Sequence, residues 1–396
     1  MNVSEKAKSV TPSATLEITA RAKKLKADGA DLIAFTAGEP DFNTPDFIVE
    51  SAITALKRGY TKYTASAGIP ELRKAVAEKF RKDNGLICDE SNVVVSCGAK
   101  ASLYHALLAL IDDGDEVIVP SPYWVTYTEQ IKLCGGTPVT VRAKKENAYK
   151  MTAEEFERAV TPRTRALLIN SPCNPTGAVY SKDELISLAQ VCEKYGLYII
   201  SDEIYENLVF DGKKHYSIGA LTDYAAKHTV TVNGVSKSYS MTGWRIGYAL
   251  APKEVAAAMS ALQGHTTSAA CTFAQYASVT ALRDGDAFIA DMRAEFARRR
   301  ETLAEELKKI DGISFSVPDG AFYVFADVSS TYGKSFNGAT INGSRDFAAA
   351  LLDFGVAVIP GAAFGDDDSV RLSYTLPPEE IARGIAKIRD FIASLR

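Results

Sequence analysis

Lys237 and Arg245 lie close together in the segment VNGVSKSYSMTGWRIGY, which covers residues 232–248. Lys237 stands between Ser236 and Ser238. A lysine among small and hydroxyl residues is a candidate to form a Schiff base, because its amine reacts only after it has lost a proton. The planar guanidinium of Arg245 is suited to hold a phosphate by two hydrogen bonds. A reactive lysine and a phosphate site together favour pyridoxal 5′-phosphate (PLP), which carries both an aldehyde and a phosphate.

Asp202 is a second residue that PLP chemistry would use. It follows the apolar run LYIIS. An anion beside the pyridine nitrogen keeps that ring protonated, so that the ring withdraws electrons from the substrate. A buried carboxylate without a partner is costly, and we therefore expect a cation beside Asp202. Taken alone, a Ser-Lys-Ser triplet also fits a solvated loop and an aspartate after a strand also fits a helix N-cap, so both interpretations stay open at this point.

A phosphate cradle is predicted at Gly98, Ala99 and Lys100. These residues stand between the apolar run VVVS and the helical pattern ASLYHALLALI. Free backbone N–H groups at the start of a helix bind anions, and the helix dipole favours negative charge there. Arg245 would close this cradle.

The segments that precede the candidate residues are short, apolar and rich in β-branched residues: VVVS, EVIVP, ALLIN, LYIISDE and TVTVNG. Helical patterns separate most of them. This alternation is typical of an α/β domain whose mostly parallel sheet is covered by helices on both faces. Ligands of such sheets bind beyond the carboxyl ends of the strands. The motifs SCGAK, SPYW, NSPCNPTG, DEIY and SK all follow such strands.

Three parts of the chain are expected. Residues 1–45 would form an N-terminal segment that packs with a smaller domain, and residues 46–284 would form the large cofactor-binding domain. From about residue 285 a long charged helix, ending in AEFARRRETLAEELKKI, would lead into a small C-terminal domain that extends to residue 396.

Composition excludes several other classes of protein. The 396 residues are 46% hydrophobic and 24% charged with a net charge of −4, which is ordinary for a globular protein and favours neither a nucleic-acid nor a membrane partner. The N-terminal stretch has no apolar run, so we expect no signal peptide and a cytoplasmic protein. The six cysteines are scattered without a CxxC pattern, so we expect reduced thiols and no metal site.

Four motifs carry a family resemblance: SCGAK at 96–100, NSPCNPTG at 170–177, SDEIY at 201–205 and VRLSY at 370–374. In order and spacing they resemble the class I aminotransferases, which are PLP-dependent. The resemblance extends over nearly the whole chain, from PSATLEITARAKKLKADGADLIAFTAGEPDF to the C-terminal end. It is strongest to the bacterial branch that contains aspartate, prephenate and aromatic aminotransferases. It implies an α/β fold, namely PLP-dependent transferase fold type I with a smaller α+β domain.

The resemblance also assigns cofactor contacts. Asn174 and Tyr205 would donate to the phenolic oxygen of PLP, and Trp124 would stack on its ring. Ser236 would join the phosphate cradle, although the usual family serine lies further upstream, where this chain has Gly234. Tyr63 would reach the phosphate of another subunit, which implies a homodimer with shared active sites. Lys237, Asp202 and Tyr205 would be the catalytic residues.

Substrate contacts follow from the same resemblance. Arg371 would bind the α-carboxylate, and its two parallel hydrogen bonds would fix the rotation of Cα over the ring. Gly38, Trp124 and Asn174 would border this carboxylate. The family commonly has a cis bond before the proline of its NP motif, so we expect Asn174–Pro175 to be cis.

The implied activity is a ping-pong transfer of the amino group between L-aspartate and 2-oxoglutarate. An aromatic or prephenate aminotransferase is the main alternative, followed by a C–S lyase or cyclopropane-forming lyase on the same scaffold. A non-catalytic binding or regulatory protein is a fourth reading, against which the intact Lys237, Asp202 and Arg371 argue. Relatives often carry lysine before the Pro-Ser-Ala-Thr segment, whereas this chain has Thr11, which weakens the case for prephenate.

Overall fold

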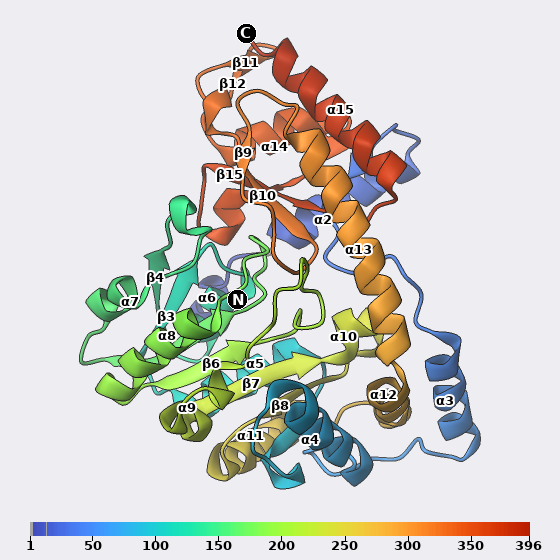
Figure 1. Ribbon diagram of the computed structural model, residues 1–396, viewed down its shortest axis with the longest axis vertical. Helices are drawn as coiled ribbons and strands as arrows, with labels where there is room; N and C mark the ends of the chain where they lie inside the picture. Colours follow the sequence, from blue (N-terminus) through green and yellow to red (C-terminus); the bar gives the residue numbers. More distant parts are fainter. Residues whose placement is uncertain (1–2, 13) are drawn as a thin grey trace.

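A seven-stranded sheet forms the centre of the larger part of the molecule (Figure 1). The computed structural model describes residues 3–12 and 14–396. The strand order is β2-β8-β7-β6-β5-β3-β4, and only β8 runs antiparallel to its neighbours. The strands are β2 (Val93–Ser96), β3 (Glu116–Ser121), β4 (Thr137–Arg142), β5 (Thr164–Asn170), β6 (Tyr198–Asp202), β7 (Thr229–Gly234) and β8 (Gly247–Leu250). The predicted α/β class and mostly parallel sheet are therefore confirmed.

Both faces of this sheet are buried, which explains why its strands are continuously apolar. On β5, Ala166 and Leu168 enter one core cluster, whereas Leu167 and Ile169 enter another. The first cluster includes side chains of α5 (Ala99–Leu110), α6 (Thr126–Leu133) and α11 (Lys253–Thr266). The second includes side chains of α7 (Ala153–Ala159), α8 (Lys182–Tyr195) and α9 (Asp223–His228). When both faces of a strand are buried, its side chains are apolar on both faces, so the sequence shows no alternation of apolar and polar residues.

A third core cluster lies towards the β2 end of the sheet. It includes side chains of α3 (Asp46–Lys57), α4 (Pro70–Asn84) and α12 (Thr272–Asp284). The short helix α10 (Val235–Ser238) follows β7 directly and carries Lys237. Among the described residues, no helix combines the length and apolar composition needed to cross a membrane.

The smaller part lies above the sheet in Figure 1 and has its own four-stranded sheet, in the order β14-β15-β10-β9. The strands of this sheet are β9 (Ser314–Phe315), β10 (Tyr323–Asp327), β14 (Ile359–Pro360) and β15 (Ser369–Ser373). The smaller part also contains β11 (Ser335–Phe336), β12 (Ala339–Thr340) and β13 (Val356–Ala357). Its helices are α14 (Ser344–Asp353) and α15 (Pro378–Ser394), and α13 (Asp286–Leu307) joins the two parts.

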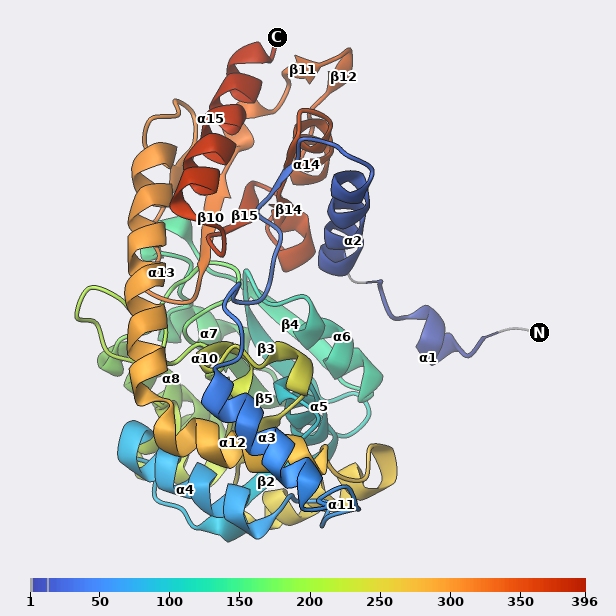
Figure 2. The same cartoon turned by 90° about the vertical axis from the view of Figure 1, so that its right-hand side faces the viewer.

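The N-terminal segment packs against this smaller part. After α1 (Glu5–Lys8) and α2 (Ala14–Ala27), the strand β1 (Ile33–Ala34) pairs in parallel with β13. Ala22 and Leu32 share a core cluster with Leu352 and Ala357. The chain then descends past the junction of the two parts to α3 (Figure 2). The boundaries expected near residues 45 and 284 stay a prediction, since these contacts do not define where a domain ends.

Candidate active site

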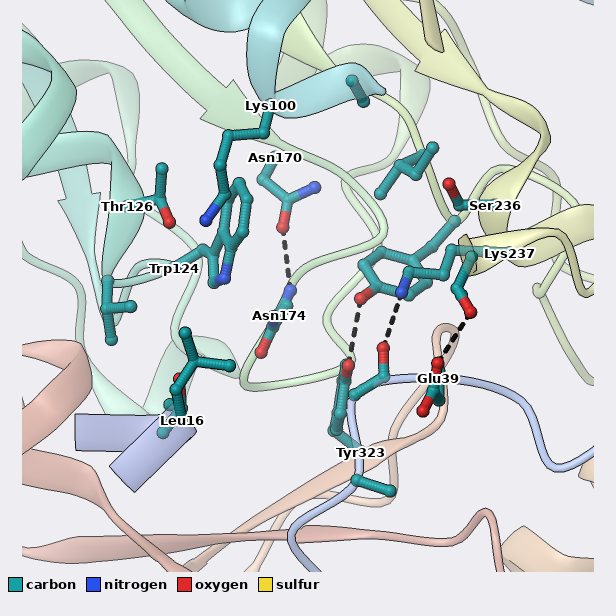
Figure 3. Close-up of a pocket in the computed structure, with 18 of the residues that line it drawn as sticks. Leu16, Glu39, Lys100, Trp124, Thr126, Asn170, Asn174, Ser236, Lys237 and Tyr323 are labelled. Carbon is teal, nitrogen blue, oxygen red and sulfur yellow. Dashed lines mark hydrogen bonds between the residues drawn. The ribbon is translucent and has the colours of Figure 1, made fainter. Parts of the chain in front are cut away.

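A cavity of about 410 Å³ lies between the two parts, at the carboxyl ends of the central strands (Figure 3). Its lining residues range from residue 15 to residue 371, so the cavity forms only when the chain is folded. Most of the residues singled out in the sequence line it: Gly38, Ala99, Lys100, Trp124, Asn174, Asp202, Tyr205, Ser236, Lys237, Arg245 and Arg371. Gly98 and Tyr63 do not.

Lys237 projects into this cavity from α10 (Figure 3). Its Nζ donates a hydrogen bond of 2.5 Å to the carbonyl oxygen of Gly38. Burial lowers the pKa of Lys237 to about 8; Arg245 and Arg371 act in the same direction, whereas Glu39 and Asp202 oppose it. A substantial fraction of the amine is therefore neutral near pH 8, and a neutral amine can act as a nucleophile or a base.

Asp202 ends β6 and is only 3% exposed. It accepts hydrogen bonds from the Tyr127 hydroxyl at 2.8 Å and from the Ile204 backbone N–H at 3.2 Å. Burial raises the pKa of Asp202 to about 6, against the lowering effect of these two bonds. Both donors are uncharged. The expected cation beside Asp202 is Lys237, whose charge lowers the pKa of Asp202. Among the described residues no hydrogen bond joins the two, so Asp202 has no directly bonded cation.

One corner of the cavity is suited to an anion. Gly98 is the N-cap of α5 at φ 86°, and the Arg245 guanidinium lies so close to it that a Cβ at position 98 would collide with it. Gly98 thus shapes the cavity without lining it. The backbone of Ala99 and Lys100 opens α5, and Ser236 lines the same cavity. A helix start, a guanidinium and a hydroxyl are groups that can bind a phosphate-sized anion, and the predicted phosphate cradle stays a prediction.

Arg371 forms a second positive corner, and it is buried to 3% exposure on β15. It donates to the Asn174 side-chain oxygen at 3.0 Å and to the Thr36 carbonyl at 3.1 Å. Its guanidinium also lies over the ring of Tyr323, 4.3 Å from the ring centre. Both hydrogen-bond acceptors are uncharged, and burial lowers the pKa of Arg371. A buried cation held by neutral groups favours an anionic ligand.

The amide of Asn174 is held in place by a neighbour that sequence reasoning missed. Asn170 accepts a hydrogen bond from the Asn174 backbone N–H at 2.8 Å and donates one to the Asp202 carbonyl at 2.8 Å. The Asn174–Pro175 bond is cis, as predicted from the family pattern. The strand ends β5 and β6 are thus tied together beneath the cavity.

Two tyrosines were also missed. Tyr127 orients Asp202 and packs edge-on against Trp124, with ring centres 5.5 Å apart. Trp124 lies before α6 and Tyr127 in its first turn, so helical spacing does not relate them and gives no signal. Tyr323 lies 3.0 Å from the Tyr205 hydroxyl, oxygen to oxygen, and sits in an apolar strand that carries no local signal.

The N-terminal helix α2 also borders the cavity. Leu16 points towards it in Figure 3 although its side chain is 69% exposed, and Lys23 lines its edge. The ammonium of Lys100 lies over the Trp124 ring, 4.9 Å from the ring centre. The cavity lining therefore includes an apolar side chain from α2 and cations from α2 and α5.

Tyr63 lies elsewhere on the surface and is 95% exposed. It lines a separate hollow formed by residues 61–64 and 269–273. Within one chain it does not reach the cavity of Lys237. Its expected contact with another subunit stays a prediction.

Comparison with known proteins decides the family. The family model "Aminotransferase class I and II" matches residues 30–388. The chain belongs to the class I and II aminotransferases. A probable aspartate/prephenate aminotransferase of Aquifex aeolicus is 48% identical, with 97% of each chain covered. An aspartate aminotransferase of Geobacillus stearothermophilus is 45% identical, with 99% of each covered.

Solved structures agree. The structure described as aspartate aminotransferase from Thermus thermophilus with maleate matches this aminotransferase with a TM-score of 0.93 at 43% identity, covering 99% of this chain and 100% of the other. The predicted family and fold type are confirmed, whereas the roles of individual cavity residues stay predictions.

Proposed function

We propose that this aminotransferase moves the amino group between L-aspartate and 2-oxoglutarate by a ping-pong mechanism, using PLP. The observation that carries the proposal is the buried Arg371, held by neutral acceptors at the same cavity as Lys237 and Asp202. A buried guanidinium there would bind the carboxylate that all amino acid substrates share. The names of the Geobacillus and Thermus relatives support aspartate as donor, and maleate, like aspartate, has two carboxyl groups.

The cavity residues fit PLP. Asp202 lacks a directly bonded cation among the described side chains, and a protonated pyridine nitrogen would supply one. Arg245, Ser236 and the start of α5 would hold the phosphate, and Asn174 and Tyr205 would hold the phenolic oxygen. When bound, PLP withdraws electrons from the substrate Cα and so acidifies its C–H bond.

The chain's own residues would do three things. Arg371 would bind the α-carboxylate and thereby fix the rotation of Cα. Lys237, with its lowered pKa, would take the proton from Cα and return it later. Tyr127 would hold Asp202 in place at 2.8 Å. Because the oxo acid product leaves before the second oxo acid enters, the two half-reactions share one set of groups.

Lys100 is the group that we propose for the second carboxylate of aspartate and glutamate. Its backbone opens α5, whereas its side chain extends along the cavity wall over Trp124. Burial lowers the pKa of Lys100, and the charge of Arg245 lowers it further. An anion beside it would relieve both effects.

An aromatic or prephenate substrate is the second candidate. The observation in its favour is Leu16, an apolar side chain at the cavity edge that is 69% exposed. The Aquifex relative's name also includes prephenate. Against it, Thr11 stands where relatives often have lysine, and it does not line the cavity.

We also propose a homodimer in which Tyr63 completes the partner's cavity. Its exposure and its hollow beside residues 269–273 support a contact with another chain.

A panel of donors tests the proposal. Aspartate, phenylalanine, tyrosine and alanine are each assayed as donors with 2-oxoglutarate, and glutamate is assayed as donor with oxaloacetate. Prephenate is assayed as acceptor with aspartate and with glutamate as donors. The proposal expects aspartate to have the highest kcat/KM among donors other than glutamate. A higher value for phenylalanine or tyrosine would favour the second candidate, and release of pyruvate or ammonia without transfer would favour a lyase.

A further inference from the structure

The segment that carries Gly38 and Glu39 touches the groups around Lys237 at two points. The Gly38 carbonyl accepts a hydrogen bond from Lys237 Nζ at 2.5 Å. The Thr242 hydroxyl donates to Glu39 Oε2 at 2.6 Å. Gly38 and Glu39 are exposed, whereas Thr36 before them and Pro40 after them are buried. The exposed pair is held from both sides: on the preceding side the Thr36 carbonyl accepts a hydrogen bond from Arg371, and on the following side further contacts come from Asp41 and Phe42.

Asp41 and Phe42 follow Gly38 and Glu39 after one intervening proline. Both contact the guanidinium of Arg299. Nη1 of Arg299 donates to Asp41 Oδ1 at 2.7 Å. The guanidinium carbon lies 5.3 Å from the centre of the Phe42 ring and 5.6 Å from that of Phe296. Nε of Arg299 donates to Glu295 Oε1 at 2.8 Å. One flat cation is thus stacked on two rings and bonded at its edges to two carboxylates.

The location of Arg299 gives this contact its importance. It lies on α13, the helix that joins the large and small parts, and the segment from β1 to α3 passes between the same two parts (Figure 2). Arg299 is only 6% exposed. A lysine could not replace it fully, because an ammonium lacks both the flat face and the fork of donors.

We propose that Arg299 is a positioning residue for transamination, which fixes Gly38 and Glu39 beside Lys237 by holding Asp41 and Phe42 against α13. The part that concerns catalysis rests on the proposed function and on the expectation that Gly38 borders the substrate carboxylate. Displacing a positioned group by about one ångström can cost on the order of 100-fold in rate, so a distant side chain that sets this position is functionally important.

Arg300 provides a matched control on the same helix. It is 3% exposed, bonds Asp211 through both carboxylate oxygens at 2.7 Å, and lies 4.9 Å from the centre of the Phe210 ring. It therefore shares the burial, ion pair and aromatic stacking of Arg299. Asp211 and Phe210, however, do not line the cavity.

Hydrogen exchange on full-length protein, as purified and with PLP added, tests the positioning directly. Arg299→Met should speed amide exchange in residues 37–44 by roughly 10-fold or more. Arg300→Met should speed exchange near residues 208–213 and leave residues 37–44 unchanged. Equal changes in residues 37–44 for both variants, or none for Arg299→Met, would overturn the proposal. If Arg299→Met does not fold, Asp41→Asn replaces it in this experiment, because asparagine keeps the shape of the side chain. Unchanged amide exchange of residues 37–44 in Asp41→Asn would also overturn the proposal.

Kinetics then test the catalytic part. Arg299→Met should lower kcat/KM for aspartate by roughly 10- to 100-fold, mainly by raising KM. Arg299→Lys should recover part of this loss. Arg300→Met should keep kcat/KM within about threefold of wild type. Changed exchange with unchanged KM would overturn the catalytic role. If wild-type protein transaminates none of the donors, the proposed function fails, whereas the exchange result still decides whether Arg299 holds the segment.

Discussion

At the scale of single residues, Arg371 offers the sharpest test of the reaction. It is a buried guanidinium whose only proposed charged partner is the α-carboxylate of the substrate. Arg371→Ala should lower kcat/KM for aspartate by roughly 30- to 4,000-fold, equivalent to the loss of about 2–5 kcal/mol that truncating one member of a buried charged pair causes. Arg371→Lys should stay badly impaired because it keeps the charge without the fork.

Cofactor binding is the control for Arg371, since this residue is proposed to touch substrate and not PLP. The PLP content of both variants, read from absorbance, should match wild type. Wild-type rates in a PLP-loaded Arg371→Ala protein would rule out the carboxylate assignment.

The pKa of Lys237 gives a pH prediction with a definite sign. A lysine attacks the PLP aldehyde only when neutral, so the rate at which PLP binds covalently to apoprotein should rise with pH and level off above about pH 8. Glu39 raises this pKa by its charge, so Glu39→Gln should move the midpoint to lower pH. Stopped-flow absorbance measures the rates. Borohydride reduction followed by peptide mapping should place the cofactor on Lys237; finding it on Lys100 instead would contradict the assignment.

Lys100 belongs to this scale as well, because its side chain and its backbone have separate proposed roles. Lys100→Met keeps the backbone N–H at the start of α5 but removes the ammonium over Trp124. The value of kcat/KM should fall roughly 10-fold or more for aspartate and much less for phenylalanine, which has no second carboxylate. An equal fall for both donors would mean that Lys100 does not recognise that carboxylate.

At the scale of elements, α4 is tied to the turn after β6 by buried charges. Lys79 forms an ion pair with Glu206, and both side chains are almost fully buried. Asn84 donates to Glu206 at 2.7 Å, and Glu203 accepts from Ser217 at 2.5 Å. This network lies directly behind the Asp202–Tyr205 turn, so the strand end that faces the cavity is fixed from the other side.

Lys79→Met should therefore lower the free energy of unfolding by about 3–5 kcal/mol, because it leaves the Glu206 carboxylate buried without its cation. Lys82 on the same helix is the control. It pairs with Asp286 at 3.1 Å, but both side chains are at least 70% exposed, so Lys82→Met should change stability by less than about 1 kcal/mol. Urea unfolding of both variants measures the two free energies of unfolding. Similar decreases for the two variants would show that the buried ion pair contributes no more to stability than the exposed one.

At the scale of the whole molecule, the cavity lies where the larger and smaller parts meet, and α13 runs from one to the other. Tyr205 and Leu208 of the larger part share a core cluster with the smaller part. We propose that the division falls near residues 45 and 284, as the sequence indicates. Arg371 comes from the smaller part and Lys237 from the larger, so any change in the angle between the parts alters the distance between the groups that would hold the two ends of the substrate.

The proposed dimer can be tested by complementation. Lys237→Ala and Tyr63→Phe chains are each expected to be impaired as homodimers. In a mixed dimer, one cavity would combine the intact Lys237 of one chain with the intact Tyr63 of the other. An equal mixture, unfolded and refolded together, should therefore recover about a quarter of wild-type activity, since half the dimers are mixed and each has one intact cavity. Light scattering checks the mass. No recovery in a verified dimer would exclude shared cavities.

The sequence by itself determined the parts of this protein that depend on local order. Strands that are apolar on both faces predicted the parallel sheet, and the ends of those strands located Asp202, Asn174 and Lys237 at one edge. The motifs in register then predicted the family. These features could be read because periodicity and chain direction are properties of neighbouring residues.

The tertiary structure decided which distant groups touch. The bond from Arg371 to the Thr36 carbonyl, the bond from Tyr127 to Asp202 and the contact of Arg299 with Asp41 each join segments far apart in the chain. No local pattern sets such contacts, because they depend on how the small part and the covering helices pack on the sheet. For the same reason Asp202 was expected beside a cation, yet its direct partners in the folded chain are a tyrosine and a backbone N–H.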